Sequence, residues 1–224
     1  MNMISNNPLS YILIQPKVIN QNGLNEIITH IQKSKVKDLS VFDPQKTNHT
    51  GQTHFNVKKS TRDTQIVEMG NLFPKIESLM HSTVKNIINP FYNIQIKESE
   101  IPQILSYSVG GHYKPHVDGE SLWRSPDNEL IWKKSIDRDL SIVFFLNNDF
   151  EGGDFVFPQL KIRIKPEPGM MICFPSNHHY LHGVEPVTKG KRYSIVCWAT
   201  VQGFVSFEEQ NKQLSLRYNI DVTN

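Results

Sequence analysis

The sequence predicts a mainly β protein: a double-stranded β-helix (jelly roll) with N-terminal helices packed on one of its sheets. After Pro90, short apolar runs separated by turn residues follow one another without helical spacing, which is typical of consecutive antiparallel strands. Such strands bury their inner faces by packing sheet on sheet. Before Pro90, two apolar stretches repeat every three to four residues, which indicates supporting amphipathic helices.

The two helices are expected at residues 24–36 and 72–88. Each has one apolar face, formed in the first by Leu24, Ile27, Ile28 and Ile31, and in the second by Leu72, Ile76, Leu79, Met80, Val84, Ile87 and Ile88. Residues 38–63 lie between them and are polar and rich in turn residues. This composition predicts a loop or a short hairpin there.

Strands are expected at 101–109, 112–118, 139–147, 154–157, 161–164, 170–174, 179–186 and 191–201. We therefore expect one domain, in which residues 1–99 form a helical and loop support region, 100–203 the jelly-roll core and 204–224 a C-terminal tail. The tail resembles a strand end followed by a short, polar helix.

One long, charged segment, residues 119–137, interrupts the succession of strands and carries Trp123 and Trp132. Long loops inside compact domains are often functional, so one interpretation is a mobile flap over a nearby site. The alternative is a solvated insertion without a role.

Charge and hydropathy exclude several functions. The formal net charge is +2, from 24 basic and 22 acidic residues spread along the chain, so no basic stripe indicates a nucleic-acid partner. The N-terminus lacks the features of a signal peptide, and no apolar run is long enough to span a membrane. We expect a soluble, cytoplasmic protein.

The stretch YSVGGHYKPHVDGE, residues 107–120, contains the first candidate site residues. On an extended chain, residues two apart point to the same side, so His116 and Asp118 can present a nitrogen and a carboxylate oxygen to one point. This pair supplies two ligands of a metal site and needs a third.

The third ligand is expected from HHYLHGVEPVTKGKRYSIVCW, residues 178–198. A hairpin with a three-residue loop, Thr188-Lys189-Gly190, and a left-handed Gly190 would pair the two flanking segments. His182, Pro186, Arg192, Val196 and Trp198 would then share one face. His178 and His179 compete with His182, which we prefer for its shared face and its ten-residue spacing to Arg192.

Two histidines and one carboxylate suit non-haem Fe(II), because this facial arrangement leaves coordination positions open. A nearby arginine can hold a carboxylate through two parallel hydrogen bonds. A structural zinc site would need four closed ligands, usually including cysteines, and the chain offers no suitable pair. The residue types therefore predict a site for iron and a dicarboxylic keto acid.

At this point the sequence resembles the Fe(II)- and 2-oxoglutarate-dependent dioxygenases, specifically their prolyl 4-hydroxylase-like branch. The resemblance covers roughly residues 100–200 and lies in YSVGGHYKPHVD, RDLSIVFFLN, EGGDFVFP and HGVEPVTKGKRYSIVCW, in that order. It implies a jelly-roll oxidoreductase that binds Fe(II), 2-oxoglutarate and O2, with ascorbate as a candidate reductant. The implied reaction is hydroxylation of a C–H bond.

The resemblance also implies individual roles. His116, Asp118 and His182 would bind iron, Arg192 would pair with the distal carboxylate of 2-oxoglutarate, and Tyr107 would hydrogen-bond the co-substrate. Three further residues would lie near the substrate or the metal: Arg138, Tyr113 and Trp198. For Arg138, a charged residue at the start of a strand is an equally good interpretation. For Tyr113, strict alternation along the strand predicts the side opposite His116, unless Pro115 disturbs the alternation.

Two departures from the family pattern bear on the substrate. Many collagen-type prolyl 4-hydroxylases have lysine where this chain has Arg192, and their usual Gly-Gly-Glu-Thr turn is Gly152-Gly153-Asp154-Phe155 here. We expect a peptidyl proline in a protein or peptide substrate, with a lysyl residue or a free amino acid as the alternative. A nucleic-acid demethylase would carry a second arginine where this chain has Trp198. A jelly-roll binding module without turnover would show the same residues.

Overall fold

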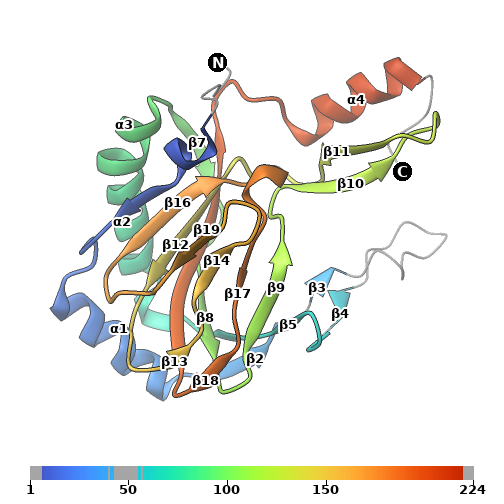
Figure 1. Ribbon diagram of the computed structural model, residues 1–224. Helices are drawn as coiled ribbons and strands as arrows, with labels where there is room; N and C mark the ends of the chain where they lie inside the picture. The colour runs from blue at the N-terminus through green and yellow to red at the C-terminus, as the bar shows by residue number, and fades with distance from the viewer. Residues whose placement is uncertain (1–6, 40, 43–54, 57, 219–224) are drawn as a thin grey trace.

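Two facing antiparallel sheets form the centre of the protein (Figure 1). The structure, a computed structural model, describes residues 7–39, 41–42, 55–56 and 58–218. The major sheet has the order β1-β16-β12-β19-β8-β6-β2, and β7 also pairs with β19. Its strands are β1 (Leu13–Gln15), β16 (Met171–Pro175), β12 (Leu140–Phe145), β19 (Arg192–Val201), β8 (Gln103–Tyr107), β6 (Gln65–Val67), β2 (Val36–Asp38) and β7 (Ile96–Ser99).

The minor sheet has the order β15-β14-β17-β9-β5. Its strands are β15 (Ile162–Ile164), β14 (Phe155–Phe157), β17 (His182–Val184), β9 (His112–His116) and β5 (Arg62–Asp63). Each of the eight predicted segments contains one of these core strands, and the predicted jelly roll is confirmed. The extra strands β1, β2, β5, β6 and β7 have two to four residues each, too few for alternation to reveal them in the sequence.

The predicted helices cover the outer face of the major sheet (Figure 1). The first, α1 (Gln21–Lys33), begins earlier than expected because the side chain of Asn20 accepts a hydrogen bond of 2.9 Å from the Gly23 N–H and caps it. The second is continuous through α2 (Phe73–Thr83), the π-helical η4 (Val84–Ile88) and α3 (Asn89–Tyr92). Short 3-10 turns precede these elements at η1 (Pro8–Tyr11) and η3 (Gly70–Leu72).

Two hydrophobic clusters lie on the two sides of the major sheet. Ile27 and Ile76 of the helices pack with outward-facing residues such as Ile142 of β12. Between the sheets, Phe145 of β12 packs with residues of the minor sheet, among them Phe155. The alternation along β12 thus separates a helix-facing side from an inter-sheet side.

Segment 119–137 contains a regular β-hairpin, β10 (Glu120–Arg124) and β11 (Leu130–Lys134), and its interpretation as a mobile flap stays a prediction. The hairpin projects from the core beside α4 (Phe207–Tyr218), the helix expected in the tail (Figure 1). The Lys134 N–H donates to Gln210 Oε1 over 2.5 Å. Cross-strand pairing and these contacts with the helix replace a loop, and neither was visible in the local composition.

Two further strand pairs complete the described residues. Strand β3 (Val41–Phe42) pairs antiparallel with β4 (Phe55–Asn56), which agrees with the hairpin expected within 38–63; the residues that join them lie outside the described part. Strand β13 (Glu151–Gly152) pairs with β18 (Val187–Lys189). None of the described helices has the length and apolarity needed to cross a membrane.

Gly169 is expected to be the glycine least tolerant of substitution near the N-terminal support. Its φ is +80°, and a Cβ there would collide with the carbonyl oxygen of Ile19, while its N–H donates to the Phe145 carbonyl. Gly203 has the same conformation, φ +82°, with open space around it. Gly203→Ala should cost about 1–2 kcal/mol of unfolding free energy, and Gly169→Ala about 1–3 kcal/mol more because of the collision.

Urea denaturation of both variants measures this difference. Equal destabilisation would show that the backbone at Ile19 moves away without cost, which contradicts the close approach.

Candidate active site

Three metal-ligating side chains meet where the minor-sheet strands β9 and β17 pair. His116 is the last residue of β9, His182 the first of β17, and the two are register partners. Asp118 lies two residues beyond the end of β9. The ligand atoms of the three residues lie within 4.8 Å of one another, and they are the only such group found among the described residues.

The geometry of this cluster is that of three donors aimed at one point. His116 Nε2 is 3.5 Å from Asp118 Oδ1, and His182 Nε2 is 3.3 Å from Asp118 Oδ2. The other ring nitrogens are engaged elsewhere: His116 Nδ1 is 2.9 Å from the Lys114 carbonyl and His182 Nδ1 is 3.0 Å from the Tyr180 carbonyl. A carbonyl can only accept, so each Nδ1 carries the proton and each Nε2 offers its lone pair.

Two serines orient the carboxylate. Ser141 Oγ donates to Asp118 Oδ2 over 2.7 Å and lies 2.8 Å from Ser176 Oγ. Both serines are buried. Neither serine was predicted as a site residue, although Ser141 is the one polar residue inside the apolar strand β12 and its position is a signal in the sequence.

The protonation states also suit a cation. Burial opposes the ionisation of Asp118, but the neighbouring His182 and His116 outweigh it and hold the pKa of Asp118 well below its usual value. Burial and the proximity of His182 lower the pKa of His116, although Asp118 opposes this shift. At neutral pH the site therefore offers an ionised carboxylate and a neutral His116.

Arg192 is a buried cation without an anionic partner. Its side chain is 1% exposed, and it forms no ion pair with any described residue. Nε donates to the Gly153 carbonyl over 3.0 Å and Nη1 to Ser194 Oγ over 3.2 Å, while the buried Nη2 has no hydrogen-bond partner. Burial lowers the pKa of Arg192 because it disfavours the charged form. An incoming carboxylate would offset this cost.

The triad opens into a pocket of about 390 Å³ between the two sheets, counting all space that atoms do not fill. Tyr107 lines this pocket, and its ring centroid lies 4.9 Å from the guanidinium carbon of Arg192. Most of the remaining wall is apolar, from Leu105, Ile142, Val143, Phe155, Val184, Val196 and Trp198. Tyr107 thus lies between the triad pocket and Arg192.

The predicted hairpin between His182 and Arg192 is wrong. The two residues lie in opposite sheets, His182 on β17 and Arg192 on β19, and the intervening β18 pairs with β13. Gly190 has the expected left-handed φ of +78°, but Pro186 is exposed and does not share the inner face. His182 and Arg192 both face the interior because the sheets pack against each other, not because they are hairpin neighbours.

Tyr113 lies on the same side of β9 as His116, against strict alternation. The register shifts between the pairs His182↔His116 and Val184↔Tyr113, so three steps on β9 oppose two on β17. This irregularity brings the rings of Tyr113 and His116 into a stack with centroids 3.5 Å apart and an interplanar angle of 18°. Pro115, which cannot donate to the ladder, lies inside it.

Trp198 and Arg138, the two other predicted residues, add no uncompensated charge to the pocket. Trp198 lines the pocket and is 8% exposed. The guanidinium carbon of Arg138 lies 3.7 Å from the Trp198 ring centroid, and its Nη2 donates to Glu100 Oε2 over 2.8 Å. Arg138 is therefore neutralised by Glu100.

The rival histidines lie outside the cluster. His178 is in the short turn η5 (His178–Tyr180), where its Nδ1 is 2.6 Å from Glu120 Oε2 and its ring stacks on Trp132. His179 lies beside it, with ring centroids 4.1 Å apart. Both contact the hairpin side of the site and not the triad.

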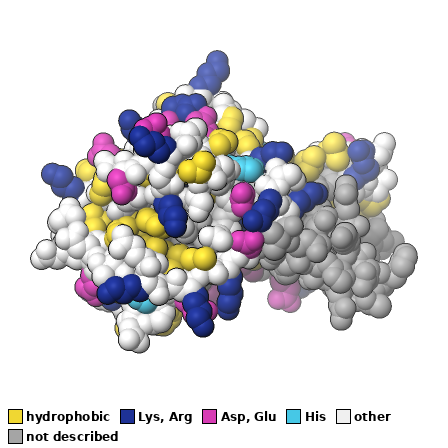
Figure 2. Space-filling view, turned by 90° about the horizontal axis from the view of Figure 1, so that it is seen from below, with side chains coloured by type: hydrophobic (Ala, Val, Ile, Leu, Met, Phe, Trp, Pro, Cys, Tyr) yellow, Lys and Arg dark blue, Asp and Glu magenta, His cyan; other side chains and the backbone are white. Residues whose placement is uncertain are grey.

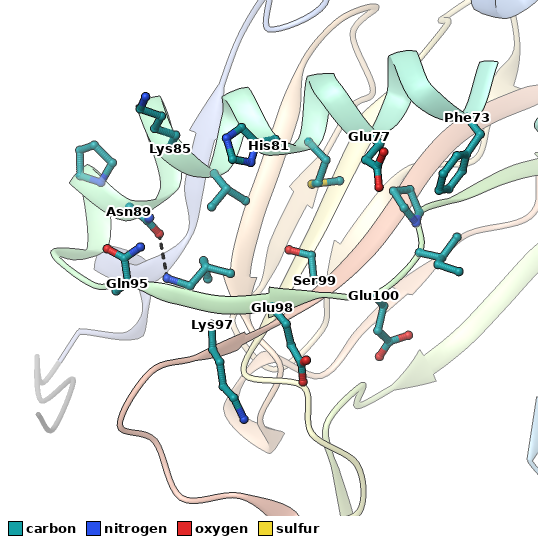
Figure 3. A pocket seen from close by; sticks show the side chains of 16 residues that line it. Phe73, Glu77, His81, Lys85, Asn89, Gln95, Lys97, Glu98, Ser99 and Glu100 are labelled. Carbon is teal, nitrogen blue, oxygen red and sulfur yellow. Dashed lines mark hydrogen bonds between the residues drawn. The ribbon is translucent and has the colours of Figure 1, made fainter. Parts of the chain in front are cut away.

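A larger groove, about 1570 Å³ by the same measure, runs between α2 and β7 (Figure 3). Its labelled side chains carry both signs of charge, including Glu77, Lys85 and Lys97 (Figure 3). No metal-ligating group of three was found among its residues in the described part of the chain. The volume of a pocket therefore does not identify the candidate site. The metal-ligating triad lines the smaller pocket.

The fold and the pocket define a class of protein: jelly rolls that hold an open 2-His-1-carboxylate triad between two sheets, the arrangement suited to non-haem iron. Residues 102–200 match the family model described as the 2OG-Fe(II) oxygenase superfamily. The central part of the chain is therefore similar in sequence to this superfamily.

Two curated relatives show a similarity of the same kind. A PKHD-type hydroxylase of Psychrobacter sp. is 32% identical over 75% of this chain and 59% of its own length. Human prolyl 3-hydroxylase 2 is 39% identical over 38% of this chain and 13% of its own length. The chain thus spans only part of the curated relatives it matches.

The structural neighbours show the fold. A viral collagen prolyl hydroxylase from Paramecium Bursaria Chlorella virus-1 has a TM-score of 0.58 at 18% identity, covering 84% of this chain and 95% of its own. A Trichoplax adhaerens prolyl hydroxylase, in complex with a hypoxia inducible factor peptide fragment, has a TM-score of 0.60 at 15% identity, covering 91% and 87%.

Proposed function

We propose that this chain is an Fe(II)- and 2-oxoglutarate-dependent oxygenase that hydroxylates a C–H bond, with a prolyl residue of a protein or peptide as its substrate. The observation that carries the proposal is the buried Arg192, which has no ion-pair partner among the described residues and lies against Tyr107, a residue of the triad pocket. A metal-binding module needs no buried cation, whereas a dicarboxylate that chelates the metal needs a partner for its far end.

The residues present fit both groups. The triad supplies two imidazole nitrogens and one carboxylate, a donor set typical of non-haem iron. The unpartnered Nη2 of Arg192 is the kind of orphaned donor that a bound carboxylate satisfies. Arg192 lies among residues of both sheets, with Gly153 and Tyr107 as neighbours.

In the proposed mechanism, His116, Asp118 and His182 hold the iron, and Ser141 keeps Asp118 oriented. Arg192 binds the distal carboxylate of 2-oxoglutarate, and Tyr107 hydrogen-bonds the same co-substrate. When bound, iron with 2-oxoglutarate and O2 supplies the oxidising chemistry that inserts one oxygen atom into a C–H bond while 2-oxoglutarate becomes succinate and CO2. The apolar walls exclude water from the reacting atoms.

Several observations support a protein or peptide substrate. The relatives named above include prolyl hydroxylases, and one neighbour was solved with a peptide. Figure 2 shows basic and acidic side chains interspersed over one face of the protein, without the single-sign field that nucleic acid requires. Lysyl hydroxylation or hydroxylation of a free amino acid is the alternative within the same chemistry, and ascorbate is proposed as the reductant.

The proposal also extends to the division of the chain. Residues 100–203 are proposed to form the catalytic core, 1–99 its support and 204–224 a tail. The support contributes β2, β5, β6 and β7 to the sheets, so the core should not fold when separated from it.

Two measurements test the function. Without oxygen, Fe(II) followed by 2-oxoglutarate should give a visible metal-to-ligand charge-transfer band. With oxygen, the protein should form succinate and add one oxygen atom to proline-containing peptides, measured by mass spectrometry against lysine-containing peptides and free amino acids. A protein that gives the band but neither succinate nor product with any of these compounds would be a binding module.

Ser141→Ala should weaken Fe(II) binding about 10-fold, because outer-sphere partners of metal ligands typically contribute 10–100-fold. The variant leaves Asp118 without its 2.7 Å hydrogen bond but keeps all three ligands. Anaerobic Fe(II) titration measures the affinity, and Ser106→Ala, a buried serine outside the pocket, is the control. Equal affinities for the two variants would show that Ser141 does not position the carboxylate.

A further inference from the structure

A second arginine, Arg62, lines the triad pocket. Arg62 lies on β5 and is the register partner of Tyr113 on β9, so it belongs to the minor sheet, whereas Arg192 belongs to the major sheet. It lines the pocket together with the triad. Its guanidinium carbon lies 4.5 Å from the ring centroid of Tyr113, and that ring stacks on His116.

Arg62 is also incompletely satisfied. Its Nε is buried and has no hydrogen-bond partner, and the residue forms no ion pair within the described part of the chain. A buried donor without a partner at the wall of a pocket indicates a missing ligand.

The charges around the pocket indicate the sign of that ligand. With the proposed iron(II) and 2-oxoglutarate bound, the charges of the metal, Asp118, the co-substrate and Arg192 cancel. Glu100 neutralises Arg138. Arg62 therefore leaves one positive charge without compensation at the pocket.

We infer that Arg62 forms a subsite for a carboxylate of the substrate, on the Tyr113 side of the triad. A carboxylate presents two oxygens to the planar guanidinium and supplies the balancing charge, whereas a peptide carbonyl presents one neutral oxygen. The carboxylate comes from a free amino acid, from a chain end or from an acidic side chain next to the hydroxylated residue. This inference rests on the proposed function and narrows its substrate class.

The experiment compares acids with their amides in the protein loaded anaerobically with Fe(II) and 2-oxoglutarate. The probes are L-proline against L-prolinamide, and acetylated Pro-Asp against Pro-Asn peptides, with binding read from the perturbation of the charge-transfer band. Each acid should bind at least about 10-fold more tightly than its amide, since hydrogen bonds to charged groups contribute about 1.5–3 kcal/mol. The two probe pairs distinguish a free amino acid from an acidic peptide.

Arg62→Met should remove the preference for acids while the half-saturating 2-oxoglutarate concentration changes less than about 2-fold. Arg62→Lys should keep part of the preference, because it keeps the charge and loses the fork. Arg163→Met, an exposed arginine paired with Glu185 away from the pocket, is the matched control. Thermal melting of each variant verifies folding.

The failure of this inference is separable from the failure of the proposed function. An intact band with equal binding of acid and amide, or with no binding of any acid, overturns the carboxylate subsite alone. A shift of the 2-oxoglutarate half-saturation in Arg62→Met assigns Arg62 to the co-substrate and overturns it as well. Loss of the band in the wild-type protein overturns the proposed function itself.

Discussion

Replacing Arg192 with methionine should raise the concentration of 2-oxoglutarate for half-saturation at least about 100-fold, because breaking a buried charge pair typically costs about 3–5 kcal/mol. Arg192 is 1% exposed and its Nη2 has no other partner, so its removal should leave the carboxylate without this donor. The measurement is an anaerobic titration of the charge-transfer band, with Fe(II) binding as an internal reference that should not change.

Two control variants sharpen this result. Arg192→Lys keeps a charge but not the planar fork, so its half-saturation should lie between wild type and Arg192→Met. Arg163→Met removes an exposed arginine whose partners are Asp154 and Glu185, and it should behave as wild type. A half-saturation that is the same in Arg192→Met and in wild type would mean that the co-substrate carboxylate is bound elsewhere, and the proposed function would lose its main support.

The second large effect is expected for His182→Ala, which should weaken Fe(II) binding more than about 100-fold and abolish the band. The substitution removes a ligand, and its effect should exceed the 10–100-fold typical of an outer hydrogen-bond partner. His182 is 5% exposed, and its free Nε2 lies 3.3 Å from Asp118 Oδ2, so solvent cannot easily replace it in the same geometry.

His179→Ala is the matched control, because His179 competes for the same role in the sequence and lies only three positions away. It should bind Fe(II) as wild type does. If His179→Ala loses iron and His182→Ala keeps it, the ligand set proposed here is incorrect. Isothermal titration without 2-oxoglutarate separates loss of metal from loss of co-substrate.

The substrate side of the pocket depended more on tertiary structure than the metal side did. Arg62 lies in a turn-rich segment without a motif, and only the pairing of β5 with β9 places it over Tyr113. Arg138 illustrates the opposite case, since a cation suggested by the sequence turns out to be neutralised by Glu100, 38 residues earlier. Ion pairing between distant residues leaves no local pattern.

The sequence by itself determined the number and position of the core strands, the helical support and the identity of the clustered residues, because alternation, helical spacing and side-chain chemistry are local properties. The alternation of side chains along a strand also predicted that Arg192, Val196 and Trp198 lie on one face of β19. Only the tertiary structure decided which sheet each strand joins, because strand pairing is made by residues far apart in the chain.

The strand pairing of the tertiary structure places His182 and Arg192 in opposite sheets instead of in one hairpin. It also produced the register shift that turns Tyr113 toward His116, and the contact between Ser141 and Asp118 from separate strands. Alternation predicts the side of a strand on which a residue lies, but sheet packing decides which residue faces it across the interior.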